Sequence, residues 1–149
     1  MLSKSDFEIL RYLRLNARQT LTEISRTTKI PISTIFDRLR KLEENVVQKY
    51  TSLLNYQRLG YGRKQLFLKV GKEDRDSLLH FLSKHLCVNT ISKIDNKFDF
   101  SVEIVFGKLQ DYYAFIGDLD RFNIVLREEY SIIEDIKKEA FLTDVVATA

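Results

Sequence analysis

The sequence is poor in several residue types, and each shortage narrows the choice of fold and location. It has one cysteine (Cys87), one proline (Pro31), two histidines and no tryptophan. A single cysteine excludes an internal disulfide framework and is typical of a reducing compartment, so we expect a cytoplasmic protein. The first ten residues lack the apolar core of a signal peptide, and no run approaches the roughly 20 apolar residues of a membrane span. We therefore expect no membrane segment.

Residue clusters that carry metal or nucleophilic chemistry are also scarce. His80 and His85 are five residues apart, so they would diverge on a helix, and no Cys-x-x-Cys pair accompanies Cys87. The glycines are scattered singly and form no phosphate-binding loop. We expect neither a metal site nor a cofactor.

Charge is present in quantity, and it is divided unevenly along the chain. The net charge is +3. Residues 1–64 hold thirteen Lys and Arg against six Asp and Glu, which gives +7, whereas residues 65–149 hold eleven against fifteen, which gives −4. This division predicts two modules, and the basic one is the candidate for binding a polyanion.

The most informative stretch of the basic half is residues 32–44. Its apolar residues recur at helical spacing, which predicts a helix that buries one side. These residues are Ile32, Ile35, Phe36, Leu39 and Leu42. Hydroxyl and guanidinium groups follow the same spacing on the opposite side. Such groups are the ones that a helix needs in the DNA major groove.

The residues before this stretch predict two further helices. Residues 6–15 read as the first, with Ser5 as its N-cap. Thr20 and Glu23 form a capping-box pattern that opens the second, which ends near Thr28. Pro31 then favours a turn and a new helix start. Two short helices joined in this way are a helix-turn-helix, whose second helix reads the groove.

After residue 44 the sequence predicts a small wing. Asn45 suits a left-handed helix cap. Residues 46–50 are β-prone, and a short extended run near residues 53–54 could pair with them. Lys49 would then lie near the phosphate backbone.

The acidic half predicts a sheet covered by two helices. Strands are expected at residues 65–70, 88–94, 98–106 and 125–137, with a short edge piece at 140–142. Helices are expected at 74–85, with inward Leu78, Leu79, Leu82 and Leu86, and at 108–119, with inward Leu109, Tyr112, Tyr113 and Ile116. The order βαββαβ is ferredoxin-like and leaves one sheet face uncovered, so a homodimer is expected.

Residues 2–60 resemble the DNA-binding domain of the Lrp/AsnC family, the leucine-responsive or feast/famine transcriptional regulators. The segments that carry the resemblance are DFEIL, NARQTLTEIS, STIFDRLRKLE, NVVQKY and RLG. Lys29 and Asn45 stand where the family has glycine, and both positions are expected to need positive φ. The acidic half resembles the family's effector-sensing domain by pattern more than by motif.

The resemblance implies an α+β protein with a winged helix-turn-helix at residues 1–54, a linker at 55–64 and a ferredoxin-like effector and oligomerisation domain at 65–149. Its partners would be double-stranded DNA and further copies of the chain. An amino acid or other small molecule would bind at Asn96, Phe98 and Asp99, which match the family's Gly-x-aromatic-Asp turn without its glycine. The alternative for Asp99, which its position alone favours, is a polar residue on the outer face of its strand.

The DNA contacts follow from the positions of the side chains on the helix-turn-helix. Ser33, Thr34 and Arg38 are predicted to contact base edges. Asp37 either accepts from a cytosine amino group or pairs with Lys41. Arg18, Arg40, Lys41 and Lys49 are predicted to contact phosphates. Two other readings stay open: an enzyme similar to the siroheme decarboxylases, which would use basic residues and histidines in the second module, and an interaction module without DNA function.

Overall fold

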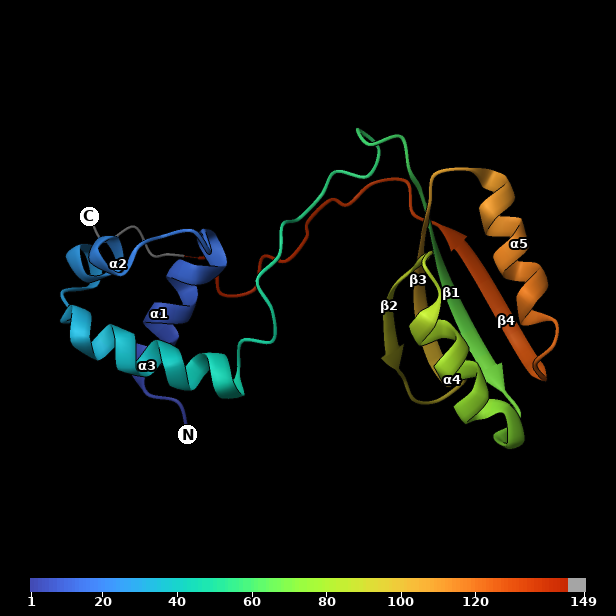
Figure 1. The fold of residues 1–149 in the computed structure, drawn as a ribbon, viewed down its shortest axis with the longest axis horizontal. Helices are drawn as coiled ribbons and strands as arrows, with labels where there is room; N and C mark the ends of the chain where they lie inside the picture. Colours follow the sequence, from blue (N-terminus) through green and yellow to red (C-terminus); the bar gives the residue numbers. More distant parts are fainter. Residues whose placement is uncertain (145–149) are drawn as a thin grey trace. The chain divides into compact units, whose positions relative to one another are not determined.

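A computed structural model describes residues 1–144, which fold into two compact units (Figure 1). The first unit comprises residues 1–53 together with residues 136–144, and the second comprises residues 54–135. The chain thus leaves the first unit after residue 53 and returns to it after residue 135. Each unit has its own hydrophobic core.

Three helices form most of the first unit: α1 (Lys4–Leu15), α2 (Leu21–Thr28) and α3 (Ile32–Asn45). Their inward side chains make one buried cluster of Ile9, Leu10, Ile24, Ile35 and Leu42. The three predicted helices are confirmed, and the short connection between α2 and α3 gives the helix-turn-helix layout.

Helix α1 begins earlier than the sequence predicted, because Ser3 and not Ser5 is its N-cap. The Ser3 hydroxyl accepts a hydrogen bond from the Asp6 N–H at 3.2 Å, and the Asp6 carboxylate accepts from the Ser3 N–H at 2.7 Å. This is a capping box with aspartate in place of the usual glutamate or glutamine. The capping box predicted at Thr20 and Glu23 is confirmed, with corresponding distances of 3.1 and 2.7 Å.

The predicted wing strands are absent from residues 46–61, where the structure has no strand. Val47 instead packs against the core of the first unit, and the Tyr50 hydroxyl donates to Glu43 at 2.7 Å. The prediction of a left-handed cap at Asn45 is also wrong. Asn45 is the last residue of α3, and its side-chain amide donates to the Lys41 carbonyl at 2.9 Å. These side-chain contacts fix the segment without a strand ladder.

The second unit is a four-stranded antiparallel sheet in the order β2-β3-β1-β4, with two helices on one face. Its elements are β1 (Gly62–Val70), a 3-10 turn (Lys72–Asp74), α4 (Arg75–Lys84), β2 (Val88–Lys93), β3 (Phe100–Phe106), α5 (Leu109–Leu119) and β4 (Ile124–Ser131). The order of elements and the central position of β1 and β3 are those of the predicted ferredoxin-like fold.

Alternate residues of β1 and β3 supply the core of the second unit. The buried set is Leu66, Leu68, Val70, Phe100, Val102 and Ile104 from the strands, with Leu78, Leu82, Tyr112, Phe115 and Leu119 from the helices. Three predicted inward residues are exposed instead: Leu86, Leu109 and Tyr113. Leu86 follows the end of α4, and α5 is rotated so that Phe115 and Leu119 face the sheet in place of the other two.

The sheet face opposite the helices carries a cluster of charged groups around Arg63, most of whose side chain is covered. The Arg63 guanidinium donates to Glu103 at 2.7 Å and to Asp135 at 2.8 Å, and it lies 5.0 Å from the centre of the Tyr56 ring. Only 9% of the Arg63 side chain and 13% of the Glu103 side chain are exposed. Burial alone would lower the pKa of Arg63, but the hydrogen bonds to the two carboxylates raise it.

Residues 136–144 pack against the first unit, although the sequence predicted that they belong to the second. β4 ends at Ser131, not residue 137, and residues 140–142 form no strand. Arg14 of α1 donates to the carbonyl oxygens of Glu139 and Phe141 at 2.8 and 3.0 Å, and Leu142 packs against the core cluster. An apolar side chain and an arginine on α1 therefore hold this tail. The predicted second domain extended through residue 149, and its last five residues lie outside the described part of the chain.

Candidate nucleic-acid interface

The turn between α2 and α3 is held by a left-handed residue and by side-chain hydrogen bonds, among them one from the Ile30 N–H to the Thr28 hydroxyl at 3.3 Å. Lys29 has φ +63° and ψ +14°, as expected for a position where the family has glycine. The Ser25 hydroxyl donates to the Ile30 carbonyl at 2.6 Å. Pro31 follows as the N-cap of α3. This turn sets the angle at which α3 leaves α2.

A Lys29→Gly variant should be more stable than the parent protein by about 1 kcal/mol. A side chain with a Cβ is strained in the left-handed region by about 1–2 kcal/mol, and the greater freedom of glycine in the unfolded chain offsets part of the gain. Thermal or urea unfolding measures the difference. Lys29→Ala is the matched control, because it removes the charge but keeps the Cβ. Equal effects of the two substitutions would contradict the strain argument.

Helix α3 buries a narrower strip than its sequence predicted. Ile35 and Leu42 are buried and Leu39 is partly buried, but Ile32 is 46% exposed and Phe36 is 51% exposed. Three short helices enclose a small core, which the residues at i, i+4 and i+7 fill. Ile32 and Phe36 are turned away from it, beside Ser33 and Arg40.

The predicted DNA contacts fall into two groups on the surface of the first unit. Ser33, Asp37, Arg40 and Lys41 are exposed on α3, and Arg18 and Lys49 are exposed before α2 and after α3. Thr34 and Arg38 are partly buried on the side of α3 that faces α1. Among residues 1–144 no ion pair joins Asp37 to Lys41, so the carboxylate of Asp37 remains available for a ligand.

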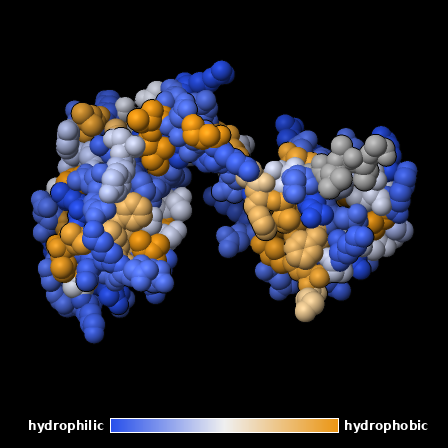
Figure 2. All heavy atoms as spheres, turned by 180° about the vertical axis from the view of Figure 1, so that it is seen from behind, coloured by the Kyte–Doolittle hydropathy of each residue, from blue (hydrophilic) through white to orange (hydrophobic). Residues whose placement is uncertain are grey.

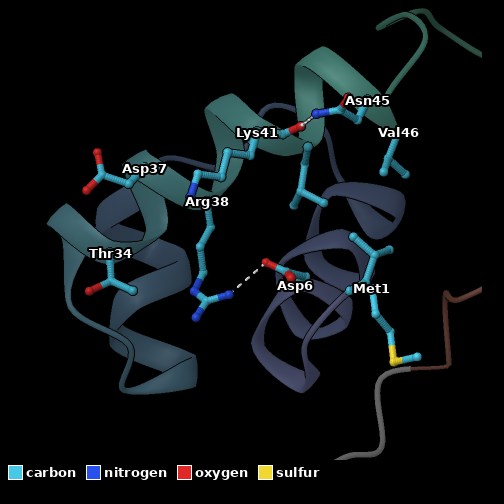
Figure 3. A pocket seen from close by; sticks show the side chains of 10 residues that line it. Met1, Asp6, Thr34, Asp37, Arg38, Lys41, Asn45 and Val46 are labelled. Carbon is cyan, nitrogen blue, oxygen red and sulfur yellow. Dashed lines mark hydrogen bonds and ion pairs between the residues drawn. The ribbon is translucent and has the colours of Figure 1, made fainter.

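Arg38 is tied to the N-terminal cap of α1 (Figure 3). Its Nη1 donates to the Asp6 carboxylate at 3.0 Å and to the Ser3 hydroxyl at 2.7 Å. The Ser3 N–H, the Ser3 hydroxyl and Arg38 together hold the pKa of Asp6 below its ordinary value, against the opposing effect of burial. Sequence reasoning did not find this contact, although a serine three residues before an aspartate would have pointed to the capping box.

An open hollow of about 590 Å³ lies beside α3, between this helix and the N-terminal end of the chain (Figure 3). Arg38 and Asp6 lie in it, together with Thr34, Asp37 and Lys41. Its lining combines both signs of charge with an apolar floor from Leu2, Leu42 and Val46. The hollow therefore shows no single preference for an anion or a cation.

The segment after α3 is anchored next to this face. Desolvation and the hydrogen bond to Glu43 raise the pKa of Tyr50 to about 12, so the hydroxyl stays protonated as a donor. Lys49 precedes this anchor and is exposed. It lines a hollow together with Leu13 and Arg14 of α1, and no wing hairpin is formed by residues 46–61.

The predicted effector residues lie at the turn between β2 and β3. Asn96 has φ +74°, the conformation that the family's glycine would adopt without strain. The Phe98 ring packs at 5.7 Å from the ring of Phe67. The Asp99 carboxylate accepts hydrogen bonds from the Val70 N–H at 2.9 Å and from Arg75 at 3.1 Å. Both Asp99 oxygens are therefore engaged by the chain itself.

Residues 1–144 lack a metal-binding cluster and a membrane-spanning helix. No group of three or more His, Cys, Asp or Glu side chains gathers there in an arrangement that could hold a metal ion. No helix in the same range is long and apolar enough to cross a membrane.

Comparison with known proteins agrees with this geometry. A family model described as winged helix-turn-helix DNA-binding matches residues 2–45. An uncharacterized HTH-type transcriptional regulator of Pyrococcus abyssi is 26% identical over 144 residues, which cover 95% of this chain and 97% of the relative. The match therefore includes both units of the chain.

Three solved structures share the fold along nearly the whole chain. LrpC of B. subtilis has a TM-score of 0.81 at 18% identity, and the match covers 92% of this chain and 98% of the LrpC chain. AsnC of E. coli has a TM-score of 0.79 at 16% identity, and the match covers 93% of this chain and 96% of the AsnC chain. A transcriptional regulator of Neisseria meningitidis, solved as a complex with L-methionine, has a TM-score of 0.81 at 21% identity, covering 93% and 94%.

The helix-turn-helix and the ferredoxin-like sheet define a two-unit DNA-binding transcriptional regulator. Its fold is that of the solved structures of LrpC and AsnC, and the motifs around α2 and α3 resemble the Lrp/AsnC family.

Proposed function

We propose that two copies of this chain bind a roughly palindromic DNA site, each placing α3 in the major groove about one helical turn from the other. The observation that carries the proposal is the division of α3 into a buried and an outward side. Ile35 and Leu42 fix the helix to the core, while Ser33, Asp37, Arg40 and Lys41 remain exposed. The geometry supports a docked helix that presents polar groups.

The proposed contacts divide into base edges and phosphates. Ser33, Thr34 and Asp37 reach toward base edges, with Asp37 accepting from a cytosine amino group. Within residues 1–144, Arg38 engages its own chain through Nη1 alone, so we propose its Nε and Nη2 as a two-donor edge that matches guanine O6 and N7. Arg18, Arg40, Lys41 and Lys49 are the proposed phosphate contacts, which position the protein without reading sequence.

The proposed dimer is supported by the uncovered face of the sheet. This face carries Phe67 and Tyr130, whose rings lie 6.0 Å apart, together with the hydrogen-bonded pair Gln65 and Ser101. Seen from behind, the second unit shows hydrophobic side chains among hydrophilic ones (Figure 2). A second copy would cover the apolar groups, as expected for a sheet with helices on one face only.

The second unit is the proposed location of a small-molecule effector, as the L-methionine complex of the Neisseria regulator suggests. Asp99 would have to release Arg75 or the Val70 N–H to bind an amino group. Asn96 and Phe98 would then supply the neighbouring surface. Thermal-shift titration with single amino acids tests this, and a lack of response to all of them would contradict it.

A Lys49→Ala variant should bind all DNA sequences more weakly, and its affinity should depend less on salt. Loss of one phosphate contact lowers the slope of log K against log salt by about 1. Fluorescence anisotropy at several salt concentrations measures the slope, on duplexes obtained by selecting bound fragments of genomic DNA. Lys93→Ala, which removes an exposed lysine from β2, is the control and should leave the slope unchanged.

Two alternative interpretations of the chain predict results that would contradict the proposed function. A pure interaction module would bind no duplex, even at low salt. A regulator without catalytic activity is the reading that the relatives favour, and we propose that the chain is not an enzyme. A siroheme-decarboxylase-like enzyme would instead give a coloured tetrapyrrole complex, which an absorbance scan would reveal.

A further inference from the structure

The side chain of Phe36 has no role in the fold that would explain a large aromatic residue at its position. It is 51% exposed and belongs to neither of the two hydrophobic clusters of the described residues. Its neighbour Ile35 is fully buried and already supplies the contact between α3 and the core. An exposed aromatic ring at the middle of a helix is therefore available to a partner.

The position of Phe36 on α3 indicates which partner this is. Ser33 lies three residues before it and Arg40 four residues after it, so the three side chains form one strip along the helix. Ser33 and Arg40 are exposed, and the buried Ile35 and Leu42 lie on the other side. The ring of Phe36 thus occupies the centre of the strip that faces away from the core.

The charge around this strip favours DNA over a protein surface. Residues 32–41 contain Arg38, Arg40 and Lys41 against the single acid Asp37. The acidic residues Glu43 and Glu44 are confined to the C-terminal end of α3, whereas the N-terminal part of a recognition helix contacts the bases. Ile32 and Phe36 alone make a small apolar surface, well below the several hundred Å² of a protein docking patch.

We propose that Phe36 reads thymine by contacting its 5-methyl group in the major groove. This methyl is the apolar group that a base edge presents there, and phenylalanine is among the side chains that contact it. Phe36 is thereby a specificity-determining residue, flanked by a base contact at Ser33 and a phosphate contact at Arg40. The inference rests on the proposed docking of α3 in the major groove.

The test removes single methyl groups from the DNA and leaves the protein unchanged. In a duplex recovered by selection, each thymine is replaced in turn by uracil, which lacks only the methyl. For the unmodified protein, one replacement in each half-site should weaken binding about fourfold, the equivalent of one buried methyl group. Fluorescence anisotropy measures each dissociation constant.

The second arm repeats these titrations with Phe36→Ala. This variant should bind the thymine duplex more weakly and should bind the thymine and uracil duplexes equally. Tyr113→Ala, which removes an exposed aromatic ring from α5, should keep the full response to uracil. Thermal unfolding confirms that the variants are folded, and Phe36→Gln, which keeps a long side chain of good helix propensity, serves as a second variant if Phe36→Ala is unstable.

The outcomes separate this inference from the function on which it rests. A protein that binds the selected duplex but responds to uracil at no position would overturn the role of Phe36. A response to uracil that persists in Phe36→Ala would do the same. Failure of the unmodified protein to bind any duplex would instead refute the docking of α3 itself.

Discussion

An Arg63→Met variant is expected to lose about 3–5 kcal/mol of the free energy of unfolding of the second unit. The substitution leaves the Glu103 carboxylate, whose side chain is only 13% exposed, without its cation, and removing one partner of such a largely covered ion pair has an effect approaching this size. Asp135 would also lose the arginine that holds residues 132–135 to the sheet. Urea unfolding measures the loss, and hydrogen exchange at β1 and β3 assigns it to this unit.

The matched control is Arg127→Met on β4. Arg127 pairs with Glu129 at 3.3 Å, but about a third of each side chain is exposed, so the loss should stay below about 1 kcal/mol. A double substitution, Arg63→Met with Glu103→Leu, should recover part of the stability because no buried charge is left unpaired. Equal losses at Arg63 and Arg127 would show that burial does not govern the strength of the Arg63 cluster.

An Arg38→Ala variant should lose about 1–3 kcal/mol of binding free energy on its selected site and discriminate less between sites. The guanidinium is held in place by Asp6 and Ser3, so its remaining donors need little ordering on binding. Asp6→Ala keeps the Arg38 guanidinium but removes the carboxylate that holds it. This variant should lower the affinity for the selected site by less than Arg38→Ala does. Anisotropy on selected and random duplexes measures both losses.

Arg40→Ala is the control for Arg38, because Arg40 is a proposed phosphate contact on the same helix. It should weaken selected and random duplexes alike. If Arg38→Ala also weakened both alike, the guanidinium would be a structural tie and not a base contact. The ion pair between Arg38 and Asp6 also depends on pH, because folding lowers the pKa of Asp6. The ionised Asp6 carboxylate therefore stabilises the fold fully above the ordinary aspartate pKa of 3.8, and this stabilisation is lost as the pH falls through the lowered pKa.

The elements that the sequence predicted well are those with local signals. The capping box at Thr20 and the break at Pro31 fixed the limits of α2 and α3 within a residue. Alternation in β1 and β3 identified the buried strand faces, since every second residue of a strand points to the same side. Each of these patterns depends only on residues close together in the chain.

The errors arose where distant residues decide the outcome. The periodicity of apolar residues placed Phe36, Leu109 and Tyr113 inward, but all three are exposed. Periodicity shows which side of a helix is apolar, but it does not show how much of that side the neighbouring elements cover. The engagement of Arg38 by Asp6 and of Asp99 by Arg75 joins residues 32 and 24 positions apart. The spacing of residues along one helix or strand does not reveal pairs between distant segments. The sequence therefore identified the candidate site residues but not the side chains to which they are hydrogen-bonded.

The packing of residues 136–144 against α1 has a consequence for how the protein is made. Leu142 completes the core of the DNA-binding unit, and it is synthesised after the whole of the second unit. During synthesis, the contact between Leu142 and this core can therefore form only after residues 54–135, which make up the ferredoxin-like unit, have been added to the chain.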